Sequence, residues 1–557
     1  LANRQTLLRH KKLPANKPLV RIIFNQCLSA KTLLRMGQQI SSFPIRPPSF
    51  PFFSLTFCLY DTIMLVDAPP EVVCLIRTVV SNSWTAGIQR ESEEPQGVFK
   101  LKLYGQPFSL SCTRDVSVRT KKMLCLILET LREHGWELTL SSDLSRIYDL
   151  STLFFQKVSF DGYDGCHVMC LSLSAHDKLQ LVNAPSEAGR IIIECVADLY
   201  QKHINANEFF EVQMKGYLWS ATTSESGFRA RQLLLNIFHR FHEVRYRYYG
   251  TANIKGTADC IFFIADCQDV GPREYCMLSL NASDRVRIIG APDELIGMVG
   301  ECLQRHWPKG IQDAKTKGDG AYFEYKMKGF PWSSCGTESV DSRLMLTIIL
   351  QQLITVGWGV VTALDVSRRA NDKAVFLLRR CAVGSVPHFA ICPAETDKIR
   401  LVNADKQMIE LVGNVLRSSW TLGIQREGLY GHSFEYRLAG YVWSSSVFGC
   451  SGQFELCRMM MTRLLYELAQ RGWRVICSAD VSSKYASDDG NNSKEHPVDV
   501  HSWFIAYTGL ASAAQPSLPN PTLSAPEQVV PTAPPLEPPP SYDEAVAGVG
   551  VLPSQKN

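Results

Sequence analysis

Long apolar runs are absent from this 557-residue chain, which has no uninterrupted stretch of 18 or more apolar residues. A helix that crosses a bilayer needs about 20 such residues, so we expect no transmembrane segment. Apolar residues make up 45% of the chain and charged residues 20%, which is typical of globular domains that bury a core. The length predicts three to four domains.

Clustered metal ligands and catalytic signatures are also missing. The eighteen cysteines form no C-x-x-C pair, the closest being Cys166 and Cys170, and the twelve histidines are dispersed. No Gly-rich phosphate loop, H-E-x-x-H or G-x-S-x-G occurs. We expect no metal, no cofactor and no enzymatic activity. Scattered cysteines on apolar segments are typical of a reducing compartment, so we expect a cytoplasmic protein.

Acidic residues are absent from the start of the chain. Residues 1–57 contain nine Lys or Arg and no Asp or Glu, so the net charge of +4 becomes −5 once this segment is removed. The rest of the chain has no excess of Lys and Arg over Asp and Glu, and this argues against nucleic-acid binding. We interpret the basic segment 1–49 as disordered or as an artefact of the gene model.

Internal repetition is the main feature that is present. Four Asp-led blocks begin at Asp61, Asp177, Asp284 and Asp397: "DTIMLVDAPPE", "DKLQLVNAPSE", "DRVRIIGAPDE" and "DKIRLVNADKQ". A second block keeps the same period around Gly105, Gly216, Gly329 and Gly440: "FKLKLYGQPFS", "FEVQMKGYLWS", "FEYKMKGFPWS" and "FEYRLAGYVWS". Two independent landmarks with one period indicate tandem domains of about 110 residues.

Each copy predicts five strands and two helices, and therefore an α+β fold. Asp67 and Asn183 are expected to cap the first helix. We predict that each module closes its own core and that the array unfolds in more than one transition. The predicted boundaries are 1–49 (basic segment), 50–158, 166–267, 274–382 and 388–508 (modules 1 to 4), and 509–557 (tail).

Copy two departs from the others near its end. Copies one, three and four have a Gly-Trp pair there, with Trp136, Trp358 and Trp473, which we assign to the core. Copy two has "FHRFHEVRYRYYG", with Arg240, His242, Arg245 and Arg247. We expect this copy to be the least stable, or this segment to be a specialised surface.

Two repeated residue types are candidates for function. The turn residues Asp61, Asp177, Asp284 and Asp397, and the acids Asp143, Asp365 and Asp480, suit turns and strand ends, because Asp accepts local backbone N–H bonds. The loop residues Trp219, Trp332 and Trp443 follow a Gly by three positions. We assign them to the core, and the alternative is a surface site for a peptide or ligand.

The tail 509–557 is rich in proline and is expected to be disordered with polyproline character. It contains two short signatures: P-T-A-P, formed by Pro531, Thr532, Ala533 and Pro534, and P-P-x-Y, formed by Pro539, Pro540 and Tyr542. Together they resemble the late-domain motifs of retroviral Gag proteins and of arrestin-like trafficking adaptors.

This resemblance implies two partners. The P-P-x-Y signature would bind the WW domain of a HECT-type ubiquitin ligase, and the P-T-A-P signature the ubiquitin-E2-variant domain of ESCRT-I. The sequence thus predicts a non-enzymatic adaptor that binds an unknown cargo protein and is cytoplasmic or associated with endosomes. The alternative is a ligand-binding or catalytic repeat body that uses the tail as a turnover handle.

Overall fold

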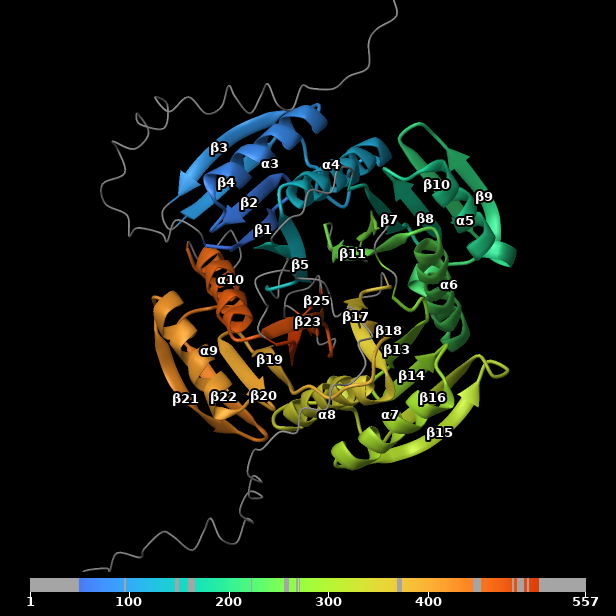
Figure 1. Ribbon diagram of the computed structural model, residues 1–557, viewed down its shortest axis with the longest axis vertical. Coiled ribbons are helices and arrows are strands. Elements are labelled where there is room, and N and C mark those ends of the chain that lie inside the picture. Colours follow the sequence, from blue (N-terminus) through green and yellow to red (C-terminus); the bar gives the residue numbers. More distant parts are fainter. Residues whose placement is uncertain are drawn as a thin grey trace, which may run out of the picture. The chain divides into compact units, whose positions relative to one another are not determined.

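The computed structural model describes residues 50–509, apart from 95–96, 146–149, 159–165, 222, 255–259, 267–268, 270, 368–372, 444–451, 483–484, 488–494 and 498–499. These residues form four copies of one arrangement, in which three hairpins alternate with two helices (Figure 1). The predicted α+β class and the four tandem modules are confirmed.

Repeat 1 shows the arrangement. Its elements are β1 (Phe52–Cys58), β2 (Thr62–Val66), α3 (Pro70–Ser83), β3 (Ile88–Glu94), β4 (Val98–Leu103), α4 (Arg114–Glu133), β5 (Trp136–Ser142) and β6 (Thr152–Lys157). The strands form one sheet in the order β3-β4-β2-β1-β6-β5, and every neighbouring pair is antiparallel.

The other repeats follow the same order. Repeat 2 consists of β7 (Val168–Ser174), β8 (Lys178–Val182), α5 (Ser186–Val196), β9 (Tyr200–Asn205), β10 (Phe209–Met214), α6 (Ser224–Glu243), β11 (Tyr246–Ala252) and β12 (Cys260–Ala265). Repeat 3 consists of β13 (Tyr275–Asn281), β14 (Arg285–Ile289), α7 (Asp293–His306), β15 (Ile311–Lys317), β16 (Tyr322–Met327), α8 (Glu338–Leu353), β17 (Trp358–Leu364) and β18 (Val375–Arg380).

Repeat 4 adds one small hairpin to the pattern. It consists of β19 (His388–Ala394), β20 (Lys398–Val402), α9 (Lys406–Ser419), β21 (Ile424–Tyr430), β22 (Ser433–Leu438), α10 (Gln453–Gln470), β23 (Trp473–Ala479) and β26 (Ser502–Tyr507). The extra hairpin, β24 (Tyr485–Ser487) with β25 (Glu495–Pro497), lies between β23 and β26.

The prediction of five strands per repeat was wrong, because each sheet has six. The missed strands are β3, β9, β15 and β21, which form one edge of each sheet. An edge strand with an exposed outer side lacks the apolar alternation that reveals a half-buried strand. In β3, "IQRESEE", most residues are charged or polar and no residue is buried.

The predicted helix caps at Asp67 and Asn183 were also wrong. These residues adopt left-handed φ angles of 57° and 54°, and the equivalent Asn403 has 60°. Asn, Asp and Gly are the residue types that tolerate this conformation, which explains their recurrence. Helices α3 and α5 begin instead after Pro69 and Pro185, without a side-chain cap.

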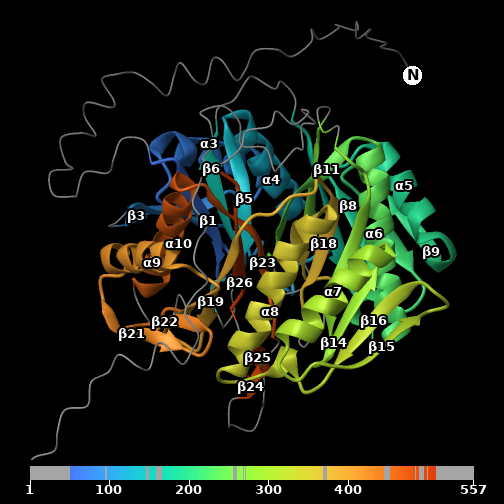
Figure 2. The same cartoon turned by 60° about the horizontal axis from the view of Figure 1, so that its bottom comes forward.

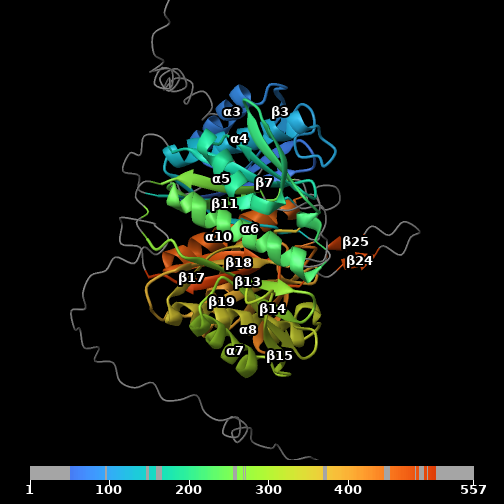
Figure 3. The same ribbon diagram turned by 90° about the vertical axis from the view of Figure 1, so that its right-hand side faces the viewer.

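The second helix of each repeat packs on the sheet of the next repeat. Helix α4 contacts β7, α6 contacts β13, α8 contacts β19, and α10 contacts β1, so the four repeats contact one another in a closed cycle. Figure 3 shows repeat 2 in green between repeat 1 in blue and repeat 3 in yellow-green.

The hydrophobic cores are therefore shared between repeats. One continuous cluster joins the helices of repeat 1 to residues such as Cys170 and Phe262 of repeat 2, and the other interfaces have equivalent clusters. The helices between two sheets are buried on more than one face: in α10 the consecutive residues Met459, Met460 and Met461 are all buried. The prediction that each module closes its own core was wrong.

The strands at the other edge of each sheet lie innermost. Strand β5 contacts β11 and β23, and β17 contacts β23 (Figures 1 and 2). A hydrogen bond of 2.8 Å between the hydroxyl groups of Tyr248 and Thr362 links β11 to β17. These four inner strands bring equivalent residues of all repeats together.

Candidate functional site

The two tail signatures, residues 531–534 and 539–542, lie outside the described residues, as does the basic segment 1–49. Within residues 50–509, the candidates are the aromatic loop, the repeated acids and the polar clusters between repeats.

The loop tryptophans are part of the core. Trp219, Trp332 and Trp443 are each 0% exposed. Each indole N–H donates to a backbone carbonyl at the start of its neighbouring strand, with distances of 2.7 Å to Lys178, 2.9 Å to Arg285 and 2.8 Å to Lys398. The core assignment is confirmed, and the surface-site alternative was wrong because the loop folds inward over its own sheet.

The same loop exposes a different aromatic residue. Tyr217, Phe330 and Tyr441 are 72%, 63% and 56% exposed. Each directly follows a glycine with a left-handed φ of 75° to 91°, and this turn lets one aromatic point outward while the other points inward. In repeat 1 the position is Gln106.

The repeated turn acids have a structural role. The backbone carbonyls of Asp61, Asp177, Asp284 and Asp397 each accept an N–H bond from the adjacent strand at 2.7 to 2.8 Å. The Asp397 carboxylate accepts a bond of 2.9 Å from Arg437, and that of Asp177 a bond of 2.7 Å from Gln213. The predicted turn position is confirmed for these residues. The expected bonds from local backbone N–H groups to their carboxylates were wrong, because among the described residues these carboxylates accept from side chains.

Four buried cations occupy one position in the second helices: Lys121, Arg231, Arg343 and Arg458. Three of them donate to the following repeat: Lys121 to Gln180 at 2.7 Å, Arg231 to Ser279 at 2.7 Å, and Arg343 to Ser482 at 2.6 Å. Sequence reasoning missed this set, although each cation precedes the first residue of the inner strand by fifteen positions within an apolar helix.

Asp143 lies at the contact between repeats 4 and 1. Burial raises its pKa to about 6, although hydrogen bonds from Ser151 and Asn253 and the charge of Arg458 favour the ionised form. The Ser151 hydroxyl lies 3.0 Å from the carboxylate. The predicted strand-end position of this acid is confirmed, because Asp143 directly follows β5.

A serine, a histidine and an acid converge beside Asp143. The Ser478 hydroxyl lies 3.2 Å from Nδ1 of His501, and Nε2 of His501 lies 3.9 Å from the Asp143 carboxylate. A catalytic triad needs the serine to donate its proton to the histidine. Here Ser478 donates to the Ser142 hydroxyl at 2.8 Å, and Ser142 also accepts from the Trp503 indole at 2.9 Å. The cluster therefore ties repeat 4 to repeat 1.

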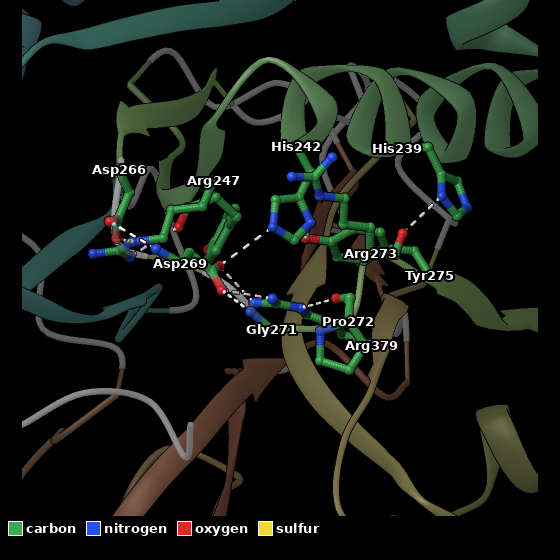
Figure 4. Close-up of polar contacts among 11 residues, drawn as sticks. His239, His242, Arg247, Asp266, Asp269, Gly271, Pro272, Arg273, Tyr275 and Arg379 are labelled. Atoms are coloured by element: carbon green, nitrogen blue, oxygen red, sulfur yellow. Dashed lines mark hydrogen bonds and ion pairs between the residues drawn. The ribbon is translucent and has the colours of Figure 1, made fainter. Parts of the chain in front are cut away.

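A second polar cluster fixes the linker between repeats 2 and 3 (Figure 4). The Asp269 carboxylate accepts two bonds of 2.7 and 2.8 Å from Arg379 and one of 3.0 Å from the Gly271 amide. His242 Nε2 lies 3.4 Å away, and its Nδ1 is 3.0 Å from the Tyr275 hydroxyl. Burial opposes the charge of Asp269, but the nearby His242 and the bonds from Arg379 overcome it and hold its pKa well below the usual range.

This cluster accounts for part of the divergence of copy two. His242 is buried against the linker, so it is part of an internal contact. Burial raises the pKa of Tyr275 to about 12, which keeps its hydroxyl protonated at neutral pH. Arg245 adopts a left-handed φ of 65° at the position where the other copies have Gly135, Gly357 and Gly472. A residue with a Cβ is strained in this conformation by about 1 kcal/mol.

No group of three or more His, Cys, Asp or Glu side chains in the described part of the chain is arranged to hold a metal ion. No helix among the described residues is long and apolar enough to cross a membrane.

Comparison with known proteins identifies the repeat. No curated protein matches the chain. The model of one domain family, which carries no functional description, matches residues 51–156, 167–264, 274–379 and 387–506, well over half of the sequence. The chain therefore belongs to this domain family, of which it contains four tandem copies.

Proposed function

We propose that the protein is a non-enzymatic adaptor whose tail recruits a WW-domain HECT-type ubiquitin ligase and ESCRT-I, and whose repeats bind a cargo protein. The observation that carries this proposal is the pair of signatures in one proline-rich segment. Prolines 539 and 540 fix φ near −65° and favour the polyproline helix that WW domains bind. Sorting at endosomes would follow from these partners.

The repeats support the proposal through the residues that they expose. Tyr217, Phe330 and Tyr441 present one aromatic side chain from each of three repeats, while the tryptophans beside them fill the core. A rigid aromatic side chain gives contact area at low entropic cost. The cargo surface that we propose is centred on these three loops.

A catalytic or ligand-binding body remains the second candidate. The Ser478, His501 and Asp143 cluster favours it by composition, since serine, histidine and acid side chains meet there. Its hydrogen bonds favour the adaptor, because the Ser478 proton is directed to Ser142.

The experiment measures capture of purified WW and ubiquitin-E2-variant domains by the full chain. Tyr542→Ala should abolish WW binding, and Pro534→Ala should abolish binding of the other domain, from affinities of about 10 to 100 μM. Ser541→Ala, at the unconstrained position of P-P-x-Y, and Pro535→Ala, next to P-T-A-P, are matched controls and should bind normally. Unchanged capture by Tyr542→Ala and Pro534→Ala would refute the proposal.

The distance between the two tail signatures gives a second test of the proposal. The centres of the two signatures are eight residues apart, which corresponds to about 25 Å in polyproline geometry. The two domains need about 30 Å between their centres when they bind side by side. We expect each domain to weaken binding of the other, which a titration into tail already saturated with one domain would measure.

A further inference from the structure

The four inner strands β5, β11, β17 and β23 begin at the same end of the folded body. The second residue of each strand therefore lies at that end. These residues are Glu137 in β5, Arg247 in β11, Gly359 in β17 and Arg474 in β23. Because the inner strands contact one another, these positions form one level around the centre. This level holds two guanidinium groups, one carboxylate and one position without a side chain.

Arg247 has its counter-ions within the protein. Its Nε lies 2.5 Å from the Asp266 carboxylate (Figure 4). Its Nη2 lies 3.8 Å from Glu137. Asp266 directly follows β12, whose last residue pairs with the first residue of β11. Burial opposes the positive charge, but Glu137 and Asp266 overcome it and raise the pKa of Arg247.

Arg474 occupies the equivalent position in repeat 4 without an equivalent acid. Trp473 pairs with Tyr507, so the residue that corresponds to Asp266 is Thr508. The Thr508 hydroxyl donates to the carbonyl of Gly472 at 3.2 Å. Within the described residues the side chain of Arg474 makes no hydrogen bond and no ion pair. Glu137, which acts on it electrostatically, is already bound by Arg132 at 3.1 Å and approached by Arg247.

The environment of Arg474 is unfavourable for a charge that lacks a partner. The residue is partly buried, and burial lowers its pKa, opposite to the shift of Arg247. Removing a charge from water without a compensating bond destabilises a protein. A guanidinium fork binds two oxygens of a carboxylate or phosphate group at once.

We propose that Arg474 anchors a binding site for a small oxyanion, a phosphate or a carboxylate, at this end of the inner strands. The bound group supplies the negative charge that Asp266 supplies to Arg247 in repeat 2. Arg132 and Arg247, which both approach Glu137, add to the positive potential.

The test is a titration of the full chain with inorganic phosphate and, separately, with acetate, at constant ionic strength. Calorimetry should detect binding of one or both probes, and the stronger probe identifies the source of the oxyanion. Arg474→Gln should weaken binding about ten-fold to hundred-fold, as expected for loss of a charged hydrogen bond. Arg471→Gln removes an exposed arginine that pairs with Glu467 and should leave binding unchanged.

Thr508→Asp keeps the test decisive if Arg474→Gln does not fold. This change places a carboxylate where repeat 2 has Asp266, so it should abolish binding of the probe and raise the thermal stability of the free protein. Binding of neither probe to the unmodified chain would overturn the proposal. Undiminished binding by either Arg474→Gln or Thr508→Asp would overturn it as well.

Discussion

Three of the four contacts between repeats join domains that the chain also connects by a short linker, whereas the contact of repeat 4 with repeat 1 joins the two ends of the folded body. The three linked contacts share one charge pattern, in which the receiving sheet carries a glutamate: Glu211, Glu324 or Glu435. At the closing contact the equivalent residue is Lys100, which donates to Glu455 of α10 at 2.9 Å.

This difference indicates how repeats 4 and 1 recognise each other. A linked contact forms at high effective concentration, because the linker holds the two repeats close together. The closing contact spans the whole body, so it depends more on its own complementarity. At the closing contact, Lys100 occupies the position where the other three interfaces have a glutamate, and it pairs with Glu455. This charge difference favours the pairing of repeat 4 with repeat 1 and disfavours pairing with another repeat.

The largest effect should come from the buried cation of the closing contact. Arg458 is 0% exposed, and its charge favours the ionised form of Asp143. We expect Arg458→Gln to lower the free energy of unfolding by about 3 kcal/mol, because it removes a buried cation that favours the ionised form of a half-buried acid. The equivalent Arg343→Gln, at the linked contact of repeats 3 and 4, should lower it less. Urea denaturation of both variants measures this, and equal losses would contradict the comparison.

Asp143 should make the closing contact sensitive to pH. Its pKa is raised from an ordinary value of 3.8 to about 6, so the folded state binds the proton more tightly. The resulting stability is fully present below pH 3.8 and is lost as the pH rises through about 6. Between pH 4 and 7 the unmodified protein should lose about 2 to 3 kcal/mol relative to Asp143→Asn.

Glu129 provides the matched measurement at a linked contact. It accepts bonds from the Val168 amide at 2.7 Å and the Asn183 side chain at 3.1 Å, and burial raises its pKa to about 7. Glu129→Gln should therefore remove a pH dependence between about 4.5 and 7. Parallel stability curves for the unmodified protein and both variants would show that neither acid is linked to folding.

A charge reversal should test the specificity of closure. Glu455→Lys places two cations at the closing contact and should cost about 2 kcal/mol, since this pair is partly buried. Adding Lys100→Glu should recover part of the loss. Glu427→Lys, which reverses an exposed pair with Arg417 in repeat 4, is the control and should cost less than about 1 kcal/mol. If the double variant is no more stable than Glu455→Lys, the pair does not determine closure.

The smallest effect is expected in repeat 2, which has Arg245 where the other repeats have glycine. Arg245→Gly should stabilise the protein by about 1 kcal/mol, because glycine adopts the left-handed conformation without strain. Arg245→Ala keeps the Cβ and should give no such gain. Thermal denaturation of the two variants compares them directly, and equal melting temperatures would indicate that the conformation is not strained.

The sequence predicted the features that repeat with an apolar period. Strands such as β20, "KIRLV", and the tryptophan loops could be located because their apolar residues recur in every copy. The outer strands β3 and β21 could not, since exposed edges carry no apolar alternation. The sequence also could not predict that neighbouring repeats share their cores. Apolar residues on both sides of a helix do not reveal whether one repeat or two repeats cover it.

The polar clusters escaped sequence analysis for a different reason. Ser478, His501 and Asp143 come from opposite ends of the folded body, and Asp269 meets Arg379 across more than a hundred residues. No local spacing encodes such contacts. The shared cores also change one expectation: instead of several unfolding transitions, the described body should show one, which calorimetry can test.

The closed cycle of contacts between repeats determines where the chain of this fold can be cut and rejoined. The amide of Lys157 donates to Pro51, and the amide of Thr508 donates to Gly472, so both ends of the folded body are fixed beside inner or central strands. Between β18 and β19 only seven residues, 381–387, connect equivalent ends. A link of similar length from residue 509 to residue 50 would make a circularly permuted chain feasible, beginning at repeat 2, 3 or 4. The contact surfaces of the repeats thus determine their order around the cycle. The site at which a permuted chain begins does not change this order.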